Sequence, residues 1–185
     1  PNIPDSLGIY PLQHLFDLGE ISSQAILILL NSKKIDFSIK IPIYTNKKYS
    51  YDPFSYITDM RESTKIISNH ITYLHLAASY NNPNILKEFI DKKLIDINVL
   101  DDNGNTPLIE ACRSKRKNNI ELLFKIENLD YLHCNNYGDD ALKILNPSLK
   151  LNNESIKTKN EYYLCLMDCF KKKKSKKKSF DDDYF

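Results

Sequence analysis

Apolar side chains in this chain recur at helical spacing within short segments that turn-forming residues separate. Residues 72–78 and 106–112 place modest side chains, mainly Leu, Ala and Cys, along one narrow face. Residues 85–90 and 119–124 are richer in Ile, Leu and Phe. Spacings of three and four residues are typical of amphipathic α-helices. The pattern therefore predicts pairs of short antiparallel helices, each pair followed by a turn.

These segments repeat at a single offset of 34 residues. The segment Thr72–Ala78 aligns with Thr106–Cys112, and Ile85–Ile90 aligns with Asn119–Phe124. One offset shared by several motifs indicates an internal repeat, which is typical of stacked architectures.

The junction before the second aligned helix carries turn and helix-start signals. Gly104, like Gly138 at the same offset of 34, permits the positive φ of a hairpin turn. Thr106 follows at the position of a helix N-cap, and Pro107 occupies the first helical position. The sequence therefore predicts that a β-turn leads directly into a helix here.

The segment Asp101–Leu108, DDNGNTPL, resembles the opening of the ankyrin repeat, D-x-x-G-x-T-P-L. Thr72–Ala78 resembles the centre of the same pattern, including its His, and Asp96–Asn98 resembles the closing D-V-N. The resemblance implies an all-α fold, an ankyrin-type helix-turn-helix solenoid with short β-turn connections. It also implies structural roles for the motif residues, among which the His bridges turns by hydrogen bonds. These residues are Thr72, His75, Gly104, Thr106, Pro107 and Gly138.

The resemblance divides the chain into successive units. We expect a degenerate first repeat in 1–40, two clear repeats in 71–102 and 103–136, a partial capping repeat in 137–150, and a short helix with a polybasic, disordered tail in 151–185. Two interpretations of 41–70 stay open. It is either an aromatic insertion on the binding face, or a degenerate repeat with helices at Tyr56–Met60 and Lys65–Ile67.

Two residues depart from the ankyrin pattern between the paired helices. Asn81 and Lys115 stand where that pattern has Gly. Asn tolerates a left-handed backbone, whereas Lys there predicts either strain or a remodelled turn.

Composition narrows the class of partner. The 185 residues carry 26 Lys and Arg against 24 Asp and Glu, but residues 171–185 alone hold seven Lys and three Asp. The remainder has 19 basic and 21 acidic residues, a net charge of −2, so nucleic-acid binding is not expected of the repeat stack. No apolar run approaches the ~18 residues of a membrane span.

Residue usage also bears on origin and compartment. Lys outnumbers Arg 23 to 3, which is typical of an AT-rich coding sequence and suggests an AT-rich microbe or a large DNA virus. The four Cys show no paired spacing, so we expect an intracellular, cytoplasmic protein. Pro1 at the first position suggests a processed chain or a fragment of a longer protein.

No motif for catalysis, a metal or a cofactor is present. The four His residues are scattered, and the chain lacks a nucleophile elbow, a P-loop and a dinucleotide fingerprint. Asp101-Asp102 and Asp139-Asp140 are typical of turns and caps rather than of a catalytic pair. Cys112, in place of a core Ala, is expected to be a small buried apolar residue. The sequence therefore predicts a non-catalytic protein without cofactors.

The resemblance implies a monomeric module that binds an unidentified protein partner. Ankyrin repeats use their turn tips and the exposed side of the first helices. We expect the binding energy to concentrate in Tyr80, Arg113 and Tyr137, because aromatic and Arg side chains dominate interfaces. The matching positions are Ser79, Tyr80, Asp102, Asn103, Asn105, Arg113, Ser114, Asn136, Tyr137 and Asp139.

The C-terminal tail supports an alternative function, a regulatory or targeting segment of a larger protein. Its basic run is interpreted as a solvated linker, a nuclear-targeting element, or a membrane-surface site that S-palmitoylation supplements. The membrane and nuclear interpretations rest on Cys165, Cys169, Lys171, Lys172, Lys173, Lys174, Lys176, Lys177 and Lys178.

Overall fold

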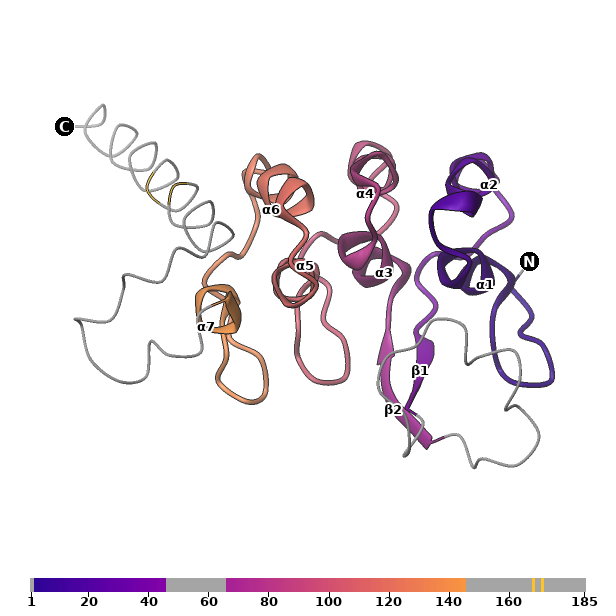
Figure 1. Ribbon diagram of the computed structural model, residues 1–185, viewed down its shortest axis with the longest axis horizontal. Helices are drawn as coiled ribbons and strands as arrows, with labels where there is room; N and C mark the ends of the chain where they lie inside the picture. Colours follow the sequence, from indigo (N-terminus) through magenta and orange to yellow (C-terminus); the bar gives the residue numbers. More distant parts are fainter. Residues whose placement is uncertain (1, 46–65, 146–167, 169–170, 172–185) are drawn as a thin grey trace.

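Paired helices stand side by side in a single row in the computed structural model (Figure 1). The structure describes residues 2–45, 66–145, 168 and 171. The first pair is α1 (Pro11–Asp17) and α2 (Ser23–Leu29), joined by the 3-10 helix η1 (Gly19–Ser22). The next elements are α3 (Tyr73–Ser79) with α4 (Pro83–Asp91), α5 (Pro107–Arg113) with α6 (Lys117–Phe124), and α7 (Ala141–Leu145).

The helices begin where the sequence supplies capping groups. The Thr106 side chain accepts a hydrogen bond from the backbone N–H of Ile109 at 3.3 Å, and Pro107 follows at the first helical position. Asn82 caps α4 in the same way, through the backbone N–H of Asn84 at 3.1 Å, ahead of Pro83. Each cap satisfies a donor that the first helical turn leaves without a partner.

Small side chains line the contact between successive first helices. Leu74, Ala77 and Ala78 of α3 are buried, and so are Ala111 and Cys112 of α5. The helices α3 and α5 pack against each other. Their small residues allow this close approach, and Cys112, at 1% exposure, is the buried apolar residue that the sequence predicts.

Aromatic contacts tie the first pair of helices to the second. The ring of Phe16 meets Tyr80 edge-on with centroids 5.3 Å apart. Phe37 meets Phe89 edge-on at 5.6 Å. Such edge-to-face pairs add to the free energy gained by burying the rings. The core is therefore continuous from the first pair of helices to the second.

The expectation of an all-α fold is wrong in one place. A two-stranded antiparallel sheet, β1 (Ile41–Thr45) with β2 (Ile66–Ile71), replaces the short β-turn between α2 and α3. Ile41 pairs with Ile71, and the register shifts between Ile43 and Tyr44. The helix expected at Lys65–Ile67 is corrected to strand from Ile66 onward, because the β-branched residues of β2 complete a hydrogen-bonded ladder with β1. Tyr56–Met60 lies outside the described residues.

The other two connections are short turns. Gly104 and Gly138 have φ of 72° and 71°, the left-handed conformation predicted from sequence. The backbone N–H of Gly104 donates to the Asp101 carbonyl at 3.1 Å, and that of Gly138 donates to the Asn135 carbonyl at 2.9 Å. We call the three connections, β1–β2, 96–106 and 130–140, the first, second and third fingers.

Lys115 takes the strained alternative that the sequence leaves open. Its φ is 55°, which Gly adopts more readily than Lys. Asn81 does not take this conformation, because α3 ends instead at Tyr80 in extended geometry, with φ −75° and ψ 151°.

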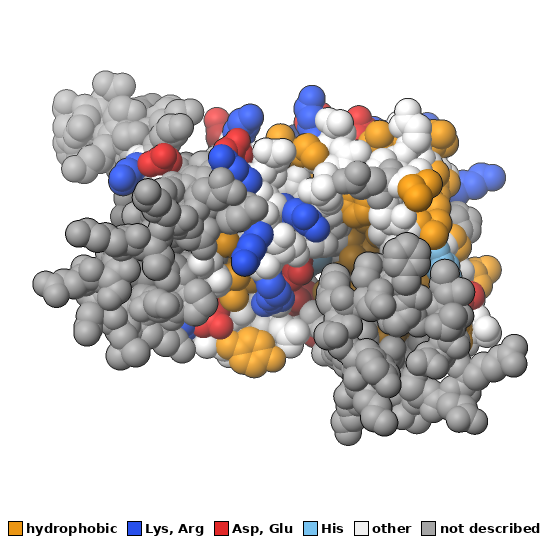
Figure 2. All heavy atoms as spheres, in the orientation of Figure 1, with side chains coloured by type: hydrophobic (Ala, Val, Ile, Leu, Met, Phe, Trp, Pro, Cys, Tyr) orange, Lys and Arg blue, Asp and Glu red, His pale blue; other side chains and the backbone are white. Residues whose placement is uncertain are grey.

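The first pair of helices exposes several large apolar side chains. Leu18 is 63% exposed, Ile21 96% and Ile28 69%. Figure 2 shows hydrophobic side chains at that end of the molecule. Across the described ranges, no helix is both long and apolar enough to cross a membrane.

Candidate partner-binding site

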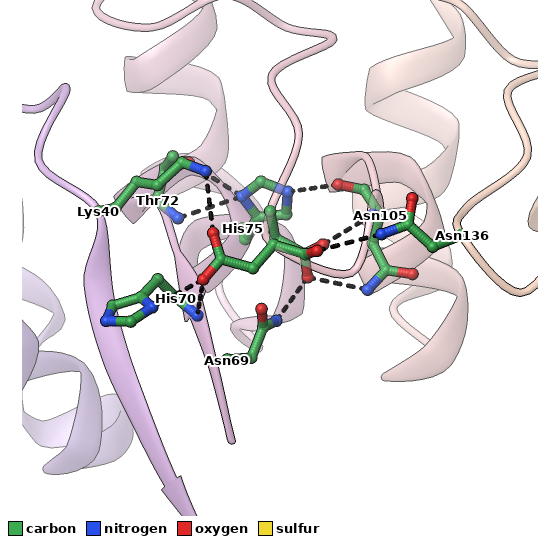
Figure 3. Close-up of polar contacts among 9 residues, drawn as sticks. Lys40, Asn69, His70, Thr72, His75, Asn105 and Asn136 are labelled. Carbon is green, nitrogen blue, oxygen red and sulfur yellow. Dashed lines mark hydrogen bonds and ion pairs between the residues drawn. The ribbon is translucent and has the colours of Figure 1, made fainter. Parts of the chain in front are cut away.

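A chain of side-chain hydrogen bonds runs through the bases of the three fingers, and Figure 3 shows the part of it that links Asn69 to Asn105. Asn69 of β2 donates to the Asp101 carboxylate at 2.7 Å, and Asn105 donates to the same oxygen at 2.8 Å. Asn135 of the third finger then donates to the side-chain oxygen of Asn105 at 2.8 Å. Because every link is an amide or a carboxylate with little exposure, the network fixes how the fingers lie relative to one another.

Asp102 joins the first finger to the second by charge. Its two oxygens meet Lys40 Nζ at 3.0 Å and His70 Nδ1 at 2.7 Å. The hydrogen bond from Lys40, followed by that from His70, lowers the pKa of Asp102 below its usual value. The backbone N–H of Asp102 also donates to the His70 carbonyl at 3.2 Å. Figure 3 shows Lys40 and His70 approaching this carboxylate from the β1 and β2 side.

His75 lies at the centre of the stack and is fully buried. Its Nε2 lies 2.9 Å from the Asn105 carbonyl oxygen, which only accepts, so Nε2 carries the proton. Its Nδ1 accepts from the Thr72 backbone N–H at 3.3 Å and lies 2.9 Å from the Thr72 hydroxyl. Burial lowers the pKa of His75, although the bond to Asn105 opposes that change. The ring is therefore neutral and structural.

The tips of the second and third fingers are bonded to each other. The Asn136 backbone N–H donates to the Asn103 carbonyl at 3.0 Å, and its side chain donates to the Asp102 carbonyl at 3.1 Å. The Tyr137 hydroxyl donates to the Asn103 side chain at 3.2 Å. Tyr137 nevertheless remains 70% exposed. Its ring is thus held at one end and open to a partner along its face.

Arg113 of α5 is an exposed cation that is hydrogen-bonded to the base of the second finger. Its Nη1 donates to Glu110 at 2.8 Å, and its Nη2 donates to the Asn105 side chain at 3.0 Å. Its side chain is 44% exposed. Burial raises the pKa of Glu110, against the lowering effect of Arg113. The guanidinium is therefore fixed in orientation while part of it faces solvent.

Three further expected contact residues are partly accessible. The Ser79 hydroxyl donates to the Leu76 carbonyl at 2.9 Å. Ser114 ends α5, and its backbone N–H donates to the Glu110 carbonyl at 3.0 Å. Asp139 pairs with Lys143 at 2.5 Å. All three are intermediate in exposure.

Two of the expected contact residues are not on the accessible surface. Tyr80 is only 9% exposed, because its ring packs against Phe16 and its hydroxyl donates to the Gly19 carbonyl. Asn105 is fully buried in the finger network. The expectation that Tyr80 is a binding anchor is therefore wrong, and Asn105 acts on the surface only by orienting Arg113.

Asn119 and Arg116 are structural residues that were not singled out from the sequence. Asn119, buried at the start of α6, donates to the carbonyls of Ala77 at 3.3 Å, Ala78 at 2.8 Å and Tyr80 at 2.9 Å. Arg116 Nε donates to the Ser79 carbonyl at 2.7 Å. Together they satisfy the carbonyls at the end of α3, where the ankyrin pattern places a Gly. The available sequence signal was Asn81 in place of the Gly of the ankyrin pattern, because it indicates that the end of α3 is capped by other groups.

The remaining expectations concern metals and the tail. Among the described residues, no group of three or more His, Cys, Asp or Glu is placed to hold a metal ion. Lys171 is helical and exposed. Cys165, Cys169 and Lys172–Lys178 lie outside the described residues.

Comparison with known proteins accords with this geometry. The family model for ankyrin repeats in three copies matches residues 47–137, which include the pairs α3–α4 and α5–α6. An ankyrin repeat protein of fowlpox virus (strain NVSL) is 52% identical over 43 residues. That segment is 23% of this chain and 22% of the fowlpox protein, so the similarity spans less than a quarter of either chain.

Proposed function

Because the chain is an ankyrin-repeat protein, we propose that it is a non-catalytic module that recognises a protein partner with its second and third finger tips and the exposed side of α5. Ankyrin repeats generally mediate protein–protein interaction, and the finer assignment rests on Arg113 and Tyr137. Both are exposed, and both are held by hydrogen bonds to residues of the second finger.

The observation that best supports this proposal is that the Arg113 and Tyr137 side chains are already held in place before a partner binds. An Arg or Tyr side chain that is already ordered loses less conformational entropy when a partner binds. The Arg113 side chain donates to Glu110 and Asn105 and the Tyr137 hydroxyl donates to Asn103, yet both side chains keep accessible surface. Asp102, Asn103 and Asn136 add polar groups at the finger tips, which suit the rim of an interface.

Affinity capture from native cell extract tests the proposal. The bait is the full chain, either wild type or with Arg113→Ala and Tyr137→Ala together. The matched control carries Lys125→Ala and Glu127→Ala, two exposed residues beyond the second helix of the same repeat. We expect the tip variant to lose partners that wild type and control both retain. Identical captured proteins for all three baits would refute the assignment.

We also propose an intracellular, cytoplasmic location, which the unpaired spacing of the four Cys supports. A second role, attachment to an anionic membrane surface, is supported by seven Lys within residues 171–178. Co-sedimentation with phosphatidylserine vesicles tests it against pure phosphatidylcholine vesicles. Absence of salt-sensitive binding to the anionic vesicles would rule this role out.

A further inference from the structure

The turn between α5 and α6 carries a dense group of positive charges. Residues 113–117 read Arg-Ser-Lys-Arg-Lys. This segment holds two of the three Arg residues in a chain that uses Lys 23 times. The planar guanidinium of Arg suits bidentate pairing with a carboxylate better than the ammonium of Lys. Figure 2 shows Lys and Arg side chains gathered in the middle of the face, over α5 and this turn.

Lys115, Arg116 and Lys117 of this segment line a cavity rather than a flat surface. The cavity has a volume of about 220 Å³ and opens between two neighbouring helix–helix turns. One wall is Lys115–Asn119, and the other is Tyr80, Asn81 and Pro83. It therefore lies between adjacent repeats, at the end of α5 opposite to the second finger.

The charges of this cavity are not neutralised within the described part of the chain. No carboxylate of the described residues forms an ion pair with Lys115, Arg116 or Lys117, whereas Arg113 is paired with Glu110. Arg116 is anchored through Nε to the Ser79 carbonyl at 2.7 Å and through Nη1 to Asn81 at 3.4 Å. These two hydrogen bonds orient the guanidinium, and the sequence neighbours Lys115 and Lys117 are both exposed.

The backbone adds to this electrostatic character. Arg116 is the N-cap of α6 but makes no side-chain cap, so the positive end of the helix faces the same turn. Lys115 has a left-handed φ of 55°, which is strained for a residue with a Cβ. A Gly at this position would remove the strain but also the positive charge.

We propose that this cavity binds an acidic segment of the protein partner, whose carboxylates pair with Lys115, Arg116 and Lys117. The inference rests on the proposed function and adds a second contact surface to it. A nucleic acid would need a continuous basic stripe, and the chain outside 171–185 has 19 basic against 21 acidic residues. An acidic peptide needs only this local group of cations.

Nuclear magnetic resonance of the ¹⁵N-labelled full chain tests the proposal with a hexaglutamate peptide as the probe. The pocket variant carries Lys115→Asn and Lys117→Gln, which keep Arg116 and place a residue that tolerates positive φ at 115. The matched control carries Lys33→Gln and Lys34→Gln, which remove the same charge from an exposed turn of the first repeat. Thermal unfolding establishes that both variants are folded.

We expect the amides of Asn81, Asn118 and Asn119 to shift on titration in wild type and control. In the pocket variant their titration midpoint should rise roughly tenfold, as expected for two lost, partly screened charge pairs. The Lys run at 171–178 also attracts the probe in every sample, so its unchanged response serves as an internal reference.

Three results would overturn the proposal. The pocket amides do not respond in wild type, or they respond equally in the pocket variant, or inorganic phosphate shifts them while hexaglutamate does not. Loss of captured partners in the Arg113→Ala and Tyr137→Ala variant, together with unresponsive pocket amides, would leave the proposed function standing and remove only the acidic-peptide site.

Discussion

The His75 imidazole bonds through Nε2 to the Asn105 carbonyl at 2.9 Å, and so spans from its own helix to the next finger. Its Nδ1 accepts at the same time from Thr72, the N-cap of α3. One side chain thus satisfies a helix N-terminus and a turn carbonyl, both buried. The arrangement requires a neutral ring, because protonated Nδ1 cannot accept a hydrogen bond.

The stability of the stack should therefore fall as this ring becomes protonated. The folded state lowers the pKa of His75 below the usual 6.5, so the unfolded chain binds the proton more readily. Stability is then complete above pH 6.5 and declines as the pH falls toward the folded-state pKa. We expect a loss on the order of 1 kcal/mol between pH 7.5 and 5.5, measured by urea unfolding.

The control for this pH dependence is His75→Gln, since Gln13 is the third residue of α1, as His75 is of α3. Gln13 donates to the Pro42 carbonyl at 3.0 Å and accepts from the Tyr10 N–H at 3.5 Å. The variant should keep most of the stability but lose this part of the pH dependence. An unchanged pH slope in His75→Gln contradicts the assignment.

Asn119 should be one of the most sensitive positions in the stack. Its amide satisfies the carbonyls of Ala77, Ala78 and Tyr80 at the end of α3. Asn119→Asp keeps the shape but replaces donors with a buried charge facing those carbonyls. We expect a loss of at least about 2 kcal/mol in unfolding free energy at neutral pH. Asn118→Asp, at an exposed neighbouring position, should stay within about 0.5 kcal/mol, and equal losses would refute the capping role.

Lys115→Gly should stabilise the protein. Gly adopts a φ of 55° without the Cβ clash that Lys suffers, so we expect a gain of about 1 kcal/mol in chemical unfolding. Lys117→Gly, at the first position of α6, should instead lose a few tenths to about 1 kcal/mol because Gly is a poor helix former. Destabilisation by both substitutions would show that Lys115 is not strained.

Tyr80 should behave as a core residue and Tyr137 as a surface residue. Tyr80→Ala removes the ring that packs against Phe16 and should cost about 3 kcal/mol or more. Tyr80→Phe loses only the hydroxyl bond to Gly19, which is worth about 1 kcal/mol. Tyr137→Ala, at 70% exposure, should change the melting temperature little. A large loss of stability in Tyr137→Ala would contradict its place at the surface.

The sequence predicted the paired helices and the turns because their signals are local. Thr106, Pro107 and Gly104 mark a cap, a helix start and a left-handed turn through their own backbone preferences. The role of Asn119 could not be predicted in this way, because the carbonyls to which it donates lie 39 to 42 residues earlier in the chain.

Only part of the candidate binding surface was predicted from the sequence, because exposure also depends on contacts between residues far apart in the chain. Arg113 and Tyr137 are exposed as expected, whereas Tyr80 and Asn105 are buried. The family pattern places Tyr80 at the end of a first helix, but here the neighbouring first repeat supplies Phe16 and Gly19 to cover it. The sheet β1–β2 was missed because its two strands are separated by a long intervening segment, so their pairing leaves no local turn signal.

The most direct test of the binding surface is the quantity of captured partner protein, measured by mass spectrometry for wild type, the Arg113→Ala and Tyr137→Ala variant, and the Lys125→Ala and Glu127→Ala control. Removing two interface anchors should cost roughly 3 kcal/mol, and hence reduce the tip variant's yield at least tenfold at limiting bait. The control should match wild type. Equal yields from the three folded baits would contradict the proposal that the finger tips and α5 bind the partner.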